Sequence, residues 1–209
     1  MRLEYKKPYC GTAANRQTML TYLQVIAGIW SIFLAFIYIP SLFFRAPVER
    51  ISFRYVQRSI ILIIIVIILV IILTRYESDT LIFRIIPDFP LAGITGIVLT
   101  LAGLGFSAWA RIQLGRYWSS MVMVKVGHRI IKTGPYRIVR NPMYTGILVA
   151  FLGAAIAIGE LVVFVVLGIG IASIWEKIKA EEEILLEKFC EEYLQYKRDV
   201  RAAIIPWLV

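Results

Sequence analysis

The chain has very few residues of the types that build metal centres and disulfide bonds. Its 209 residues include two cysteines, Cys10 and Cys190, and a single histidine, His128. Structural and catalytic metal sites use Cys and His grouped at short spacings. No such group and no Cys-x-x-Cys pair occurs in this sequence, so we predict no metal site.

Charged residues are also scarce, because only 18% of the residues are charged while 59% are hydrophobic. The mean hydropathy is +0.76. A soluble domain averages about a quarter charged and about half apolar residues, so this composition predicts an integral membrane protein. No internal repeat or low-complexity linker divides the chain, and we treat residues 1–209 as a single membrane domain.

The charge-free stretches predict the membrane spans. A helix that crosses the hydrocarbon layer needs about 20 residues. The second charge-free stretch, residues 59–74, is short. Its central residues, 60–73, are all Ile, Leu or Val, and the flanking Arg58 and Arg75 can extend to the interfaces. The last stretch, residues 161–175, is also short, and we interpret it as a helix that leaves the bilayer and continues into the polar C-terminal segment. We therefore expect five spans, at residues 17–44, 59–74, 89–110, 141–159 and 161–175.

This pattern predicts an all-α integral membrane protein with about five transmembrane helices. Three N-terminal spans occupy residues 17–110, and residues 111–209 form a second half. The net charge of +9 follows this topology, since 17 of the 23 Lys and Arg residues fall on one side. The positive-inside rule places that side, with loop 3–4 and the C-terminus, in the cytoplasm and the N-terminus outside the cell membrane. Nucleic acid is not needed to explain the charge, and Cys10 and Cys190 lie on opposite faces.

The segment from Thr133 to Gly146 is unusually rich in turn formers, aromatic residues and arginines. Asn141-Pro142 predicts the start of the fourth span, because Asn is a favoured N-cap and Pro is favoured at the first helical position. Free N–H groups at a helix start attract anions, and Arg140 adds positive charge. Gly134-Pro135 predicts a turn that directs Tyr136 toward the same place. We expect this site to hold a small anionic ligand.

The C-terminal segment predicts an amphipathic helix. Glu182 falls in the middle of its apolar stripe and Glu181 on the flank, while Glu183 points away. A carboxylate on a buried stripe is costly unless it is paired or used, and Lys177 lies one turn before Glu181, close enough to pair. The stripe follows the 3.6-residue period and consists of Ile178, Leu185, Phe189, Tyr193, Tyr196 and Val200.

Together these features resemble the isoprenylcysteine carboxyl methyltransferase family. The matching pattern is Gly-Pro-Tyr-Arg-x-x-Arg-x-Pro-x-Tyr-x-Gly, followed by the paired Glu residues, the apolar stripe and Ile205-Pro206. The resemblance covers roughly residues 110 to 207. It implies a helical membrane enzyme that uses S-adenosylmethionine, which lies in a cytoplasmic pocket closed by the C-terminal helix. A lipophilic or prenylated acceptor would enter from the bilayer.

The resemblance also implies roles for individual residues. Arg140, Lys177 and Glu182 are the expected catalytic residues. Three positions depart from the family pattern, because Asn141, Lys177 and Cys190 stand where the family usually has His, Arg and Gly. The residues expected to contact the cofactor are His128, Arg129, Ile130, Ile131, Tyr136, Asn141, Pro142, Met143, Tyr144 and Glu181.

Three alternatives remain open on the sequence. The acceptor could be the amine of a phospholipid headgroup, in which case Glu181, Glu182 or His128 would have to remove a proton. The protein could be a sterol-type membrane reductase that uses NADPH, or an adaptor without enzymatic activity. A carboxylate acceptor, by contrast, is already nucleophilic and needs no general base.

Overall fold

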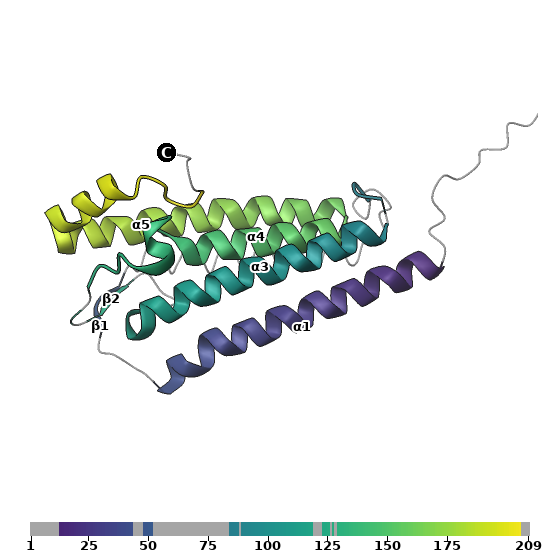
Figure 1. Ribbon diagram of the computed structural model, residues 1–209, viewed down its shortest axis with the longest axis horizontal. Helices are drawn as coiled ribbons and strands as arrows, with labels where there is room; N and C mark the ends of the chain where they lie inside the picture. Colours follow the sequence, from purple (N-terminus) through teal and green to yellow (C-terminus); the bar gives the residue numbers. More distant parts are fainter. Residues whose placement is uncertain are drawn as a thin grey trace, which may run out of the picture.

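The computed structural model describes residues 13–43, 48–51, 84–87, 89–118, 123–125, 127 and 129–205. Long helices run along the longest axis of the molecule (Figure 1). These helices are α1 (Ala13–Phe43), α3 (Pro90–Leu114), α4 (Pro142–Ile158) and α5 (Leu161–Asp199). The shorter elements are the strands β1 (Val48–Ile51) and β2 (Met123–Lys125) and the 3-10 turns η1 (Gly115–Tyr117) and η2 (Gly134–Arg137).

Four of the predicted spans coincide with these helices. Within the described residues three helices are long and apolar enough to cross a membrane, namely Leu20–Ile39, Pro90–Tyr117 and Leu161–Asp199. The helix α4 is also apolar, but its 17 residues are fewer than the about 20 that a helix needs to cross the hydrocarbon layer. The predicted span at residues 59–74 lies outside the described residues, so the number of five spans stays a prediction.

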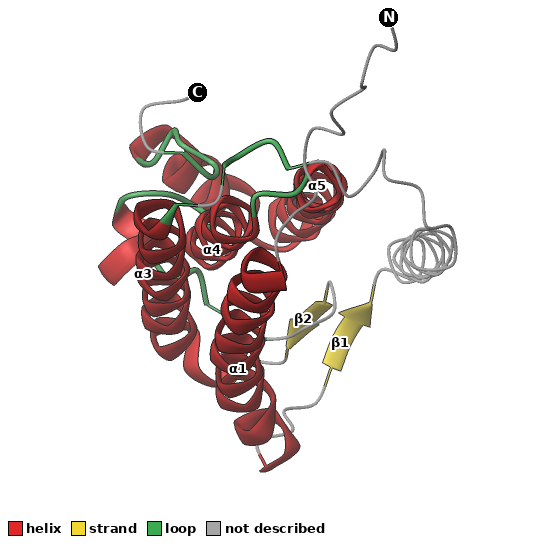
Figure 2. Cartoon of the chain, turned by 90° about the vertical axis from the view of Figure 1, so that its right-hand side faces the viewer, coloured by secondary structure: helices red, strands yellow, loops and turns green. Residues whose placement is uncertain are grey.

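A small antiparallel sheet corrects the all-α expectation. β1 and β2 pair side by side, with Val48 opposite Lys125 and Ile51 opposite Met123 (Figure 2). The pairing satisfies backbone N–H and C=O groups where the chain has left its helices. Strands of four and three residues are too short to produce a recognisable alternation in the sequence, which is why they were not predicted.

The connections lie at two opposite ends of the helices. β1, which follows α1, pairs with β2, which follows α3. At the other end the N–H of Ile85 donates to the carbonyl of Gly159 at 2.8 Å. The backbones of Arg84 and Glu160 pair there in an isolated antiparallel β-bridge. Loops 1–2 and 3–4 therefore share one side, and loops 2–3 and 4–5 share the other, as the sequence predicted. Which side faces the cytoplasm stays a prediction.

Small residues allow α3 and α4 to pack with their backbones in contact. A Cβ atom on Gly96 would lie 2.5 Å from the carbonyl oxygen of Gly153, and one on Gly103 would lie 2.5 Å from that of Gly146. Larger side chains at these positions would force the helices apart. Gly96 and Gly103 therefore let α3 and α4 pack closely along their length.

Not every glycine has this role. A Cβ atom on Gly93 would overlap the ring of Tyr22 in α1, so this glycine also allows close packing. Around Gly105, Gly168 and Gly170 no atom lies within 4 Å of the added Cβ, among the residues that are described. Within the described residues these three glycines have no close packing partner.

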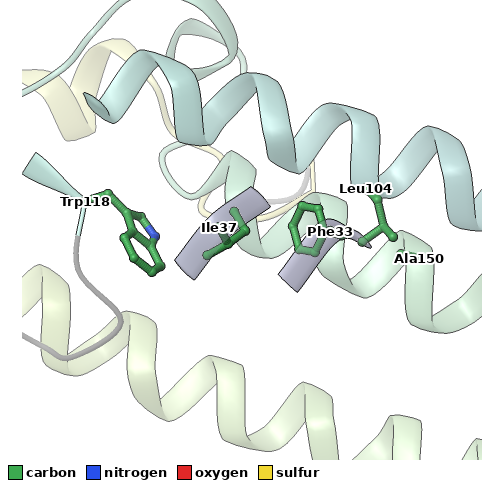
Figure 3. Close-up of a cluster of buried hydrophobic side chains, with 5 residues drawn as sticks. All are labelled: Phe33, Ile37, Leu104, Trp118 and Ala150. Atoms are coloured by element: carbon green, nitrogen blue, oxygen red, sulfur yellow. The ribbon is translucent and has the colours of Figure 1, made fainter. Parts of the chain in front are cut away.

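One apolar cluster fixes α1 to this pair of helices. Phe33 and Ile37 of α1 are buried with Leu104 of α3, Ala150 of α4 and Trp118 just after η1 (Figure 3). Such interdigitated side chains supply the packing that holds membrane helices together, because lipid tails are as apolar as the side chains themselves. Trp118 lies at the end of the cluster that borders the loop before α4.

The chain reverses direction within the segment assigned to α5. Cys190 has φ 38° and ψ −111°, which is not a helical conformation, and the residues that follow form a shorter arm. This arm folds back beside the part of α5 that comes before Cys190 (Figure 1). The expectation of one uninterrupted amphipathic helix is therefore wrong after Phe189. The stripe is still buried at Ile178, Tyr193 and Tyr196, because the arm turns its apolar side inward.

We predict that Cys190→Gly stabilises the protein. A positive φ is strained for a residue with a Cβ atom and costs about 1–3 kcal/mol, whereas glycine adopts it freely. After allowing for the greater flexibility of glycine in the unfolded chain, we expect a gain of about 1 kcal/mol. Thermal unfolding in detergent micelles measures it, with Cys190→Ala as the control that keeps the strain. Equal stability of the Gly and Ala variants would contradict the prediction.

Candidate functional site

The loop before α4 turns inward at Gly134. Its φ of +59° favours glycine, and Pro135 follows in the first turn of η2. The loop buries Pro135, Tyr136 and Val139, and Val139 has no exposed surface. The predicted turn at Gly134-Pro135 is confirmed, and it holds Tyr136 inside the protein.

The start of α4 lies where it was predicted, with Asn141 as N-cap and Pro142 as the first helical residue. The Asn141 side chain makes no capping hydrogen bond, and its Nδ2 donates to the carbonyl of Ala203 at 3.2 Å. The N–H groups of Tyr144 and Thr145 both donate to the carbonyl of Asn141, at 3.1 Å. Since Pro142 has no N–H, this helix start offers fewer donors to an anion than we expected.

The C-terminal tail, residues 200–204, lies against this helix start. The backbone N–H groups of Arg140 and Asn141 donate to the carbonyls of Ala202 and Ala203, at 2.9 and 3.0 Å. The tail therefore continues the hydrogen bonding of the loop in the manner of a short strand pair. It contacts Arg140 and Asn141, two of the residues predicted for the site.

Two hydroxyl groups that sequence reasoning missed strengthen this contact. The Thr145 hydroxyl donates to the carbonyl of Ile204 at 2.6 Å, and the Tyr196 hydroxyl donates to the carbonyl of Tyr136 at 2.8 Å. Tyr196 was recognised only as a member of the apolar stripe. A tyrosine on a buried stripe needs a partner for its hydroxyl group, and this was the available signal.

Glu182 joins the loop to the folded-back arm. Its Oε1 accepts from Arg140 Nε at 2.9 Å, and its Oε2 accepts from Lys197 Nζ at 2.8 Å. The side chains of Arg140 and Glu182 are only 9% and 12% exposed. Arg140 Nη1 in turn donates to the carbonyls of Val200 and Arg201. Glu182 is thus buried on the stripe as predicted, with both oxygens bonded to cationic side chains.

Glu181 faces a different neighbour. The hydroxyl of Tyr144, in the first turn of α4, donates to Glu181 Oε1 at 2.7 Å. Lys177 Nζ lies over the ring of Tyr144, 5.3 Å from its centre, and its charge acts on Glu181. The structure therefore brings the two predicted motifs together, the loop before α4 and the acidic pair of α5.

The two adjacent carboxyl groups titrate differently. For Glu181, burial raises the pKa, and the Lys177 charge and the Tyr144 hydrogen bond offset this only in part. For Glu182, burial also opposes ionisation, but the hydrogen bonds and charges of Lys197 and Arg140 outweigh it and lower the pKa. Glu182 is therefore held as a carboxylate, whereas Glu181 is the member of the pair better able to carry a proton.

The predicted residues divide into two groups. Arg129 is exposed and close to Tyr117 at the end of η1, and Ile130 and Ile131, which follow it, are half-buried. His128 lies outside the described residues. The residues that gather around the start of α4 are Tyr136, Arg140, Asn141, Pro142, Met143, Tyr144, Lys177, Glu181 and Glu182.

A buried arginine lies beside this group and was not singled out from the sequence. Arg111 is 9% exposed, and its guanidinium lies over the ring of Trp118, 4.5 Å from the centre. Its Nη1 donates to the carbonyl of Gly115 at 2.9 Å, and its charge acts on Tyr136. Its Nε has no hydrogen-bond partner among the residues that the structure describes. In the sequence Arg111 served only to mark the end of a span.

A buried cation without an acidic partner is costly near the membrane interior and usually has a functional reason. Nε and Nη2 together form the edge of a guanidinium that binds a carboxylate with two parallel hydrogen bonds. Because Nη1 is already bonded to Gly115, the Nε side of Arg111 is the side suited to an anionic group. Glu181 could therefore meet a cation, and the Nε side of Arg111 could meet an anion.

The chain is similar to known methyltransferases over part of its length. The family model for phospholipid methyltransferases matches residues 91–192, which is just under half of the chain. A protein-S-isoprenylcysteine O-methyltransferase of Schizosaccharomyces pombe is 28% identical over 133 residues, covering 56% of this chain and 54% of that protein. A probable protein-S-isoprenylcysteine O-methyltransferase of Oryza sativa is 22% identical over 135 residues, covering 63% of this chain and 71% of that protein.

A third relative has a different name. The cobalt-zinc-cadmium resistance protein CzcN of Cupriavidus metallidurans is 25% identical over 139 residues, covering 60% of this chain and 62% of that protein. The matched segments span 44 to 71% of the lengths of these and other relatives. They therefore relate this chain to part of each relative.

The apolar helices indicate an integral membrane protein, and over part of its length the chain is similar to methyltransferases. Over the matched segments the chain is similar, at low identity, to protein-S-isoprenylcysteine O-methyltransferases and to the phospholipid methyltransferase family.

We predict that Glu182→Gln destabilises the protein at neutral pH but not in acid. The pKa of Glu182 is lowered in the folded protein from its ordinary value of 4.5. Its stabilising effect is therefore complete above that value and disappears as the pH falls through the folded-state pKa. We expect a loss of about 2 kcal/mol at pH 7, typical of hydrogen bonds to a charged group.

Thermal unfolding of both proteins between about pH 7 and pH 3 measures this difference in stability. Glu183→Gln is the matched control, since Glu183 is the exposed neighbour of Glu182. A gap between wild type and Glu182→Gln that stays constant down to pH 3 would count against the ion pairs as its cause.

Proposed function

We propose that the protein is a membrane methyltransferase that uses S-adenosylmethionine and a lipophilic acceptor. The observation that carries the proposal is the hydrogen bond of 2.7 Å between Tyr144 and Glu181. It joins the two motifs that resemble the family, which lie 37 positions apart in the sequence. Both residues fall in the region that matches the family model.

The residues around the start of α4 suit the cofactor chemically. When bound, S-adenosylmethionine supplies a methyl group activated by a positively charged sulfonium. The carboxylate of Glu181 and the aromatic ring of Tyr144 both attract a cation. Asn141 offers its side-chain oxygen, because its amide nitrogen is bonded to Ala203. The tail that covers this region would exclude water, so that positioning supplies much of the rate acceleration.

For the acceptor we propose an isoprenylcysteine-type carboxylate, the group named for the relatives in yeast and rice. Arg111 supports this choice, since the Nε side of its guanidinium is suited to a carboxylate. A carboxylate attacks directly, so this chain would have to position the acceptor and need not remove a proton.

A second candidate is methylation of a phospholipid amine, which the description of the matching family model favours. An amine must lose a proton when it is methylated. Glu181 could accept that proton, because its raised pKa brings it closer to the pH at which an efficient general base works.

We predict that Tyr144→Phe and Glu181→Gln each weaken the binding of S-adenosylmethionine about tenfold or more, which corresponds to the loss of one hydrogen bond or charge contact. Isothermal titration calorimetry in micelles measures the affinity, with NADPH as the alternative ligand. Binding of NADPH without binding of S-adenosylmethionine would refute the proposed function in favour of a reductase. If both variants keep the protein's function in the cell although S-adenosylmethionine no longer binds, an adaptor without enzymatic activity would be favoured.

The stability of the unliganded variant shows whether lost binding is a direct effect. Because burial raises the pKa of Glu181, ionising it costs stability at neutral pH. The unliganded Glu181→Gln variant should therefore unfold no more readily than wild type at pH 7.

The acceptor can be identified from the bond that the methyl group forms. We predict that membranes incubated with tritiated S-adenosylmethionine yield a product that releases volatile methanol in alkali, as a methyl ester does and an N-methyl amine does not. Arg111→Gln should raise the KM for a farnesylcysteine acceptor about tenfold or more, through loss of a charged hydrogen bond. Arg116→Gln is the control, because Arg116 is exposed and bonds Tyr117. Alkali-stable label would favour the amine.

A further inference from the structure

The ion pair between Glu182 and Lys197 exists only because the chain reverses at Cys190. The two residues are 15 positions apart, and along a straight helix they would be separated by about 22 Å. In the structure Lys197 Nζ lies 2.8 Å from Glu182 Oε2. This contact therefore reports directly whether the arm after Cys190 is folded back.

The same carboxylate holds the tail that follows the arm. Arg140, bonded to the other oxygen of Glu182, donates through Nη1 to the carbonyls of Val200 and Arg201. The N–H groups of Arg140 and Asn141 bond the tail two residues further on. Glu182 thus connects three parts of the chain, namely the loop before α4, the arm and the tail.

Glu182 also has a direct neighbour in the proposed cofactor site. Glu181, the preceding residue, accepts the hydrogen bond from Tyr144. Successive residues on a helix point about 100° apart, so fixing Glu182 toward the arm fixes the direction of Glu181. Both oxygens of Glu182 are occupied by Arg140 and Lys197 within the described structure, which leaves Glu182 poorly suited to proton transfer.

We propose that Lys197 and Glu182 are positioning residues that hold the arm and tail, residues 191–204, closed over the cofactor site. Their ion pair must break when the cofactor enters or leaves. This inference rests on the proposed function for the identity of the ligand. The closed arrangement itself does not depend on that function.

The variant Lys197→Met removes the ion pair while keeping much of the side chain. Lys197→Arg retains the charge and tests for rescue. The matched control is Lys179→Met, because Lys179 forms an ion pair of 3.0 Å with Glu176 that is exposed and does not cross the reversal. Both Met variants lose one positive charge and one ion pair.

Two measurements on the full-length protein in micelles decide the question. Hydrogen exchange followed by mass spectrometry reports the N–H groups of Arg140 and Asn141, which are protected by the tail. Stopped-flow fluorescence reports the dissociation rate of S-adenosylhomocysteine, used as the probe. In Lys197→Met we expect both rates to rise about tenfold, as for the loss of one charged hydrogen bond. Lys197→Arg should restore them largely, and Lys179→Met should match wild type.

Unchanged exchange in Lys197→Met would overturn the proposal, since the arm would then be held by other contacts. Faster exchange with an unchanged dissociation rate would also overturn it, because closure would not control the ligand. If wild type does not bind S-adenosylhomocysteine, the proposed function fails. The closure by Lys197 and Glu182 is then judged by hydrogen exchange alone.

Discussion

The contact between the loop before α4, α5 and the folded-back arm depends on the ion pairs of Glu182, whose side chain is only 12% exposed. A charge removed from water is costly unless opposite charges and hydrogen bonds replace the lost solvation. Here the replacements come from Arg140, before α4, and from Lys197, beyond the reversal in α5. Because neither cation is a local neighbour in sequence, the carboxylate can be satisfied only when the loop, the helix and the arm are all in place. The tail is then bound through Arg140.

Close packing of α3 and α4 supplies the rigid base for this arrangement. The two helices touch through glycine backbones, and the Ser107 hydroxyl donates to the carbonyl of Met143 at 3.0 Å. That bond fixes the end of α3 against the first turn of α4, which carries Tyr144. Arg111 lies one turn beyond Ser107 on the same helix. Tyr144, proposed for the cofactor, and Arg111, proposed for the acceptor, are therefore held by one helix pair, as precise positioning requires.

Sequence reasoning could predict features that leave a local mark. Charge-free runs located the described helices, and Asn141-Pro142 located the start of α4, since both follow from neighbouring residues. The tail could not be predicted, because it is held mainly through backbone groups that every residue has. The reversal at Cys190 was hidden, because the apolar stripe keeps its helical spacing across it. The departure from the glycine usual in the family was the one available signal. Arg111 looked like an ordinary boundary residue.

The acidic pair is better understood as two residues with separate tasks than as a catalytic dyad. In a dyad two carboxyl groups share a proton because they face each other, and their pKa values separate through mutual repulsion. Here adjacent positions on a helix turn the groups apart, and each pKa has its own cause. Cations stabilise the charge of Glu182, and burial disfavours the charge of Glu181. A residue held ionised by two partners is suited to structure. Glu181 is bonded to a tyrosine and lies near a lysine, and we propose that within the pair it is the residue that meets a charged ligand.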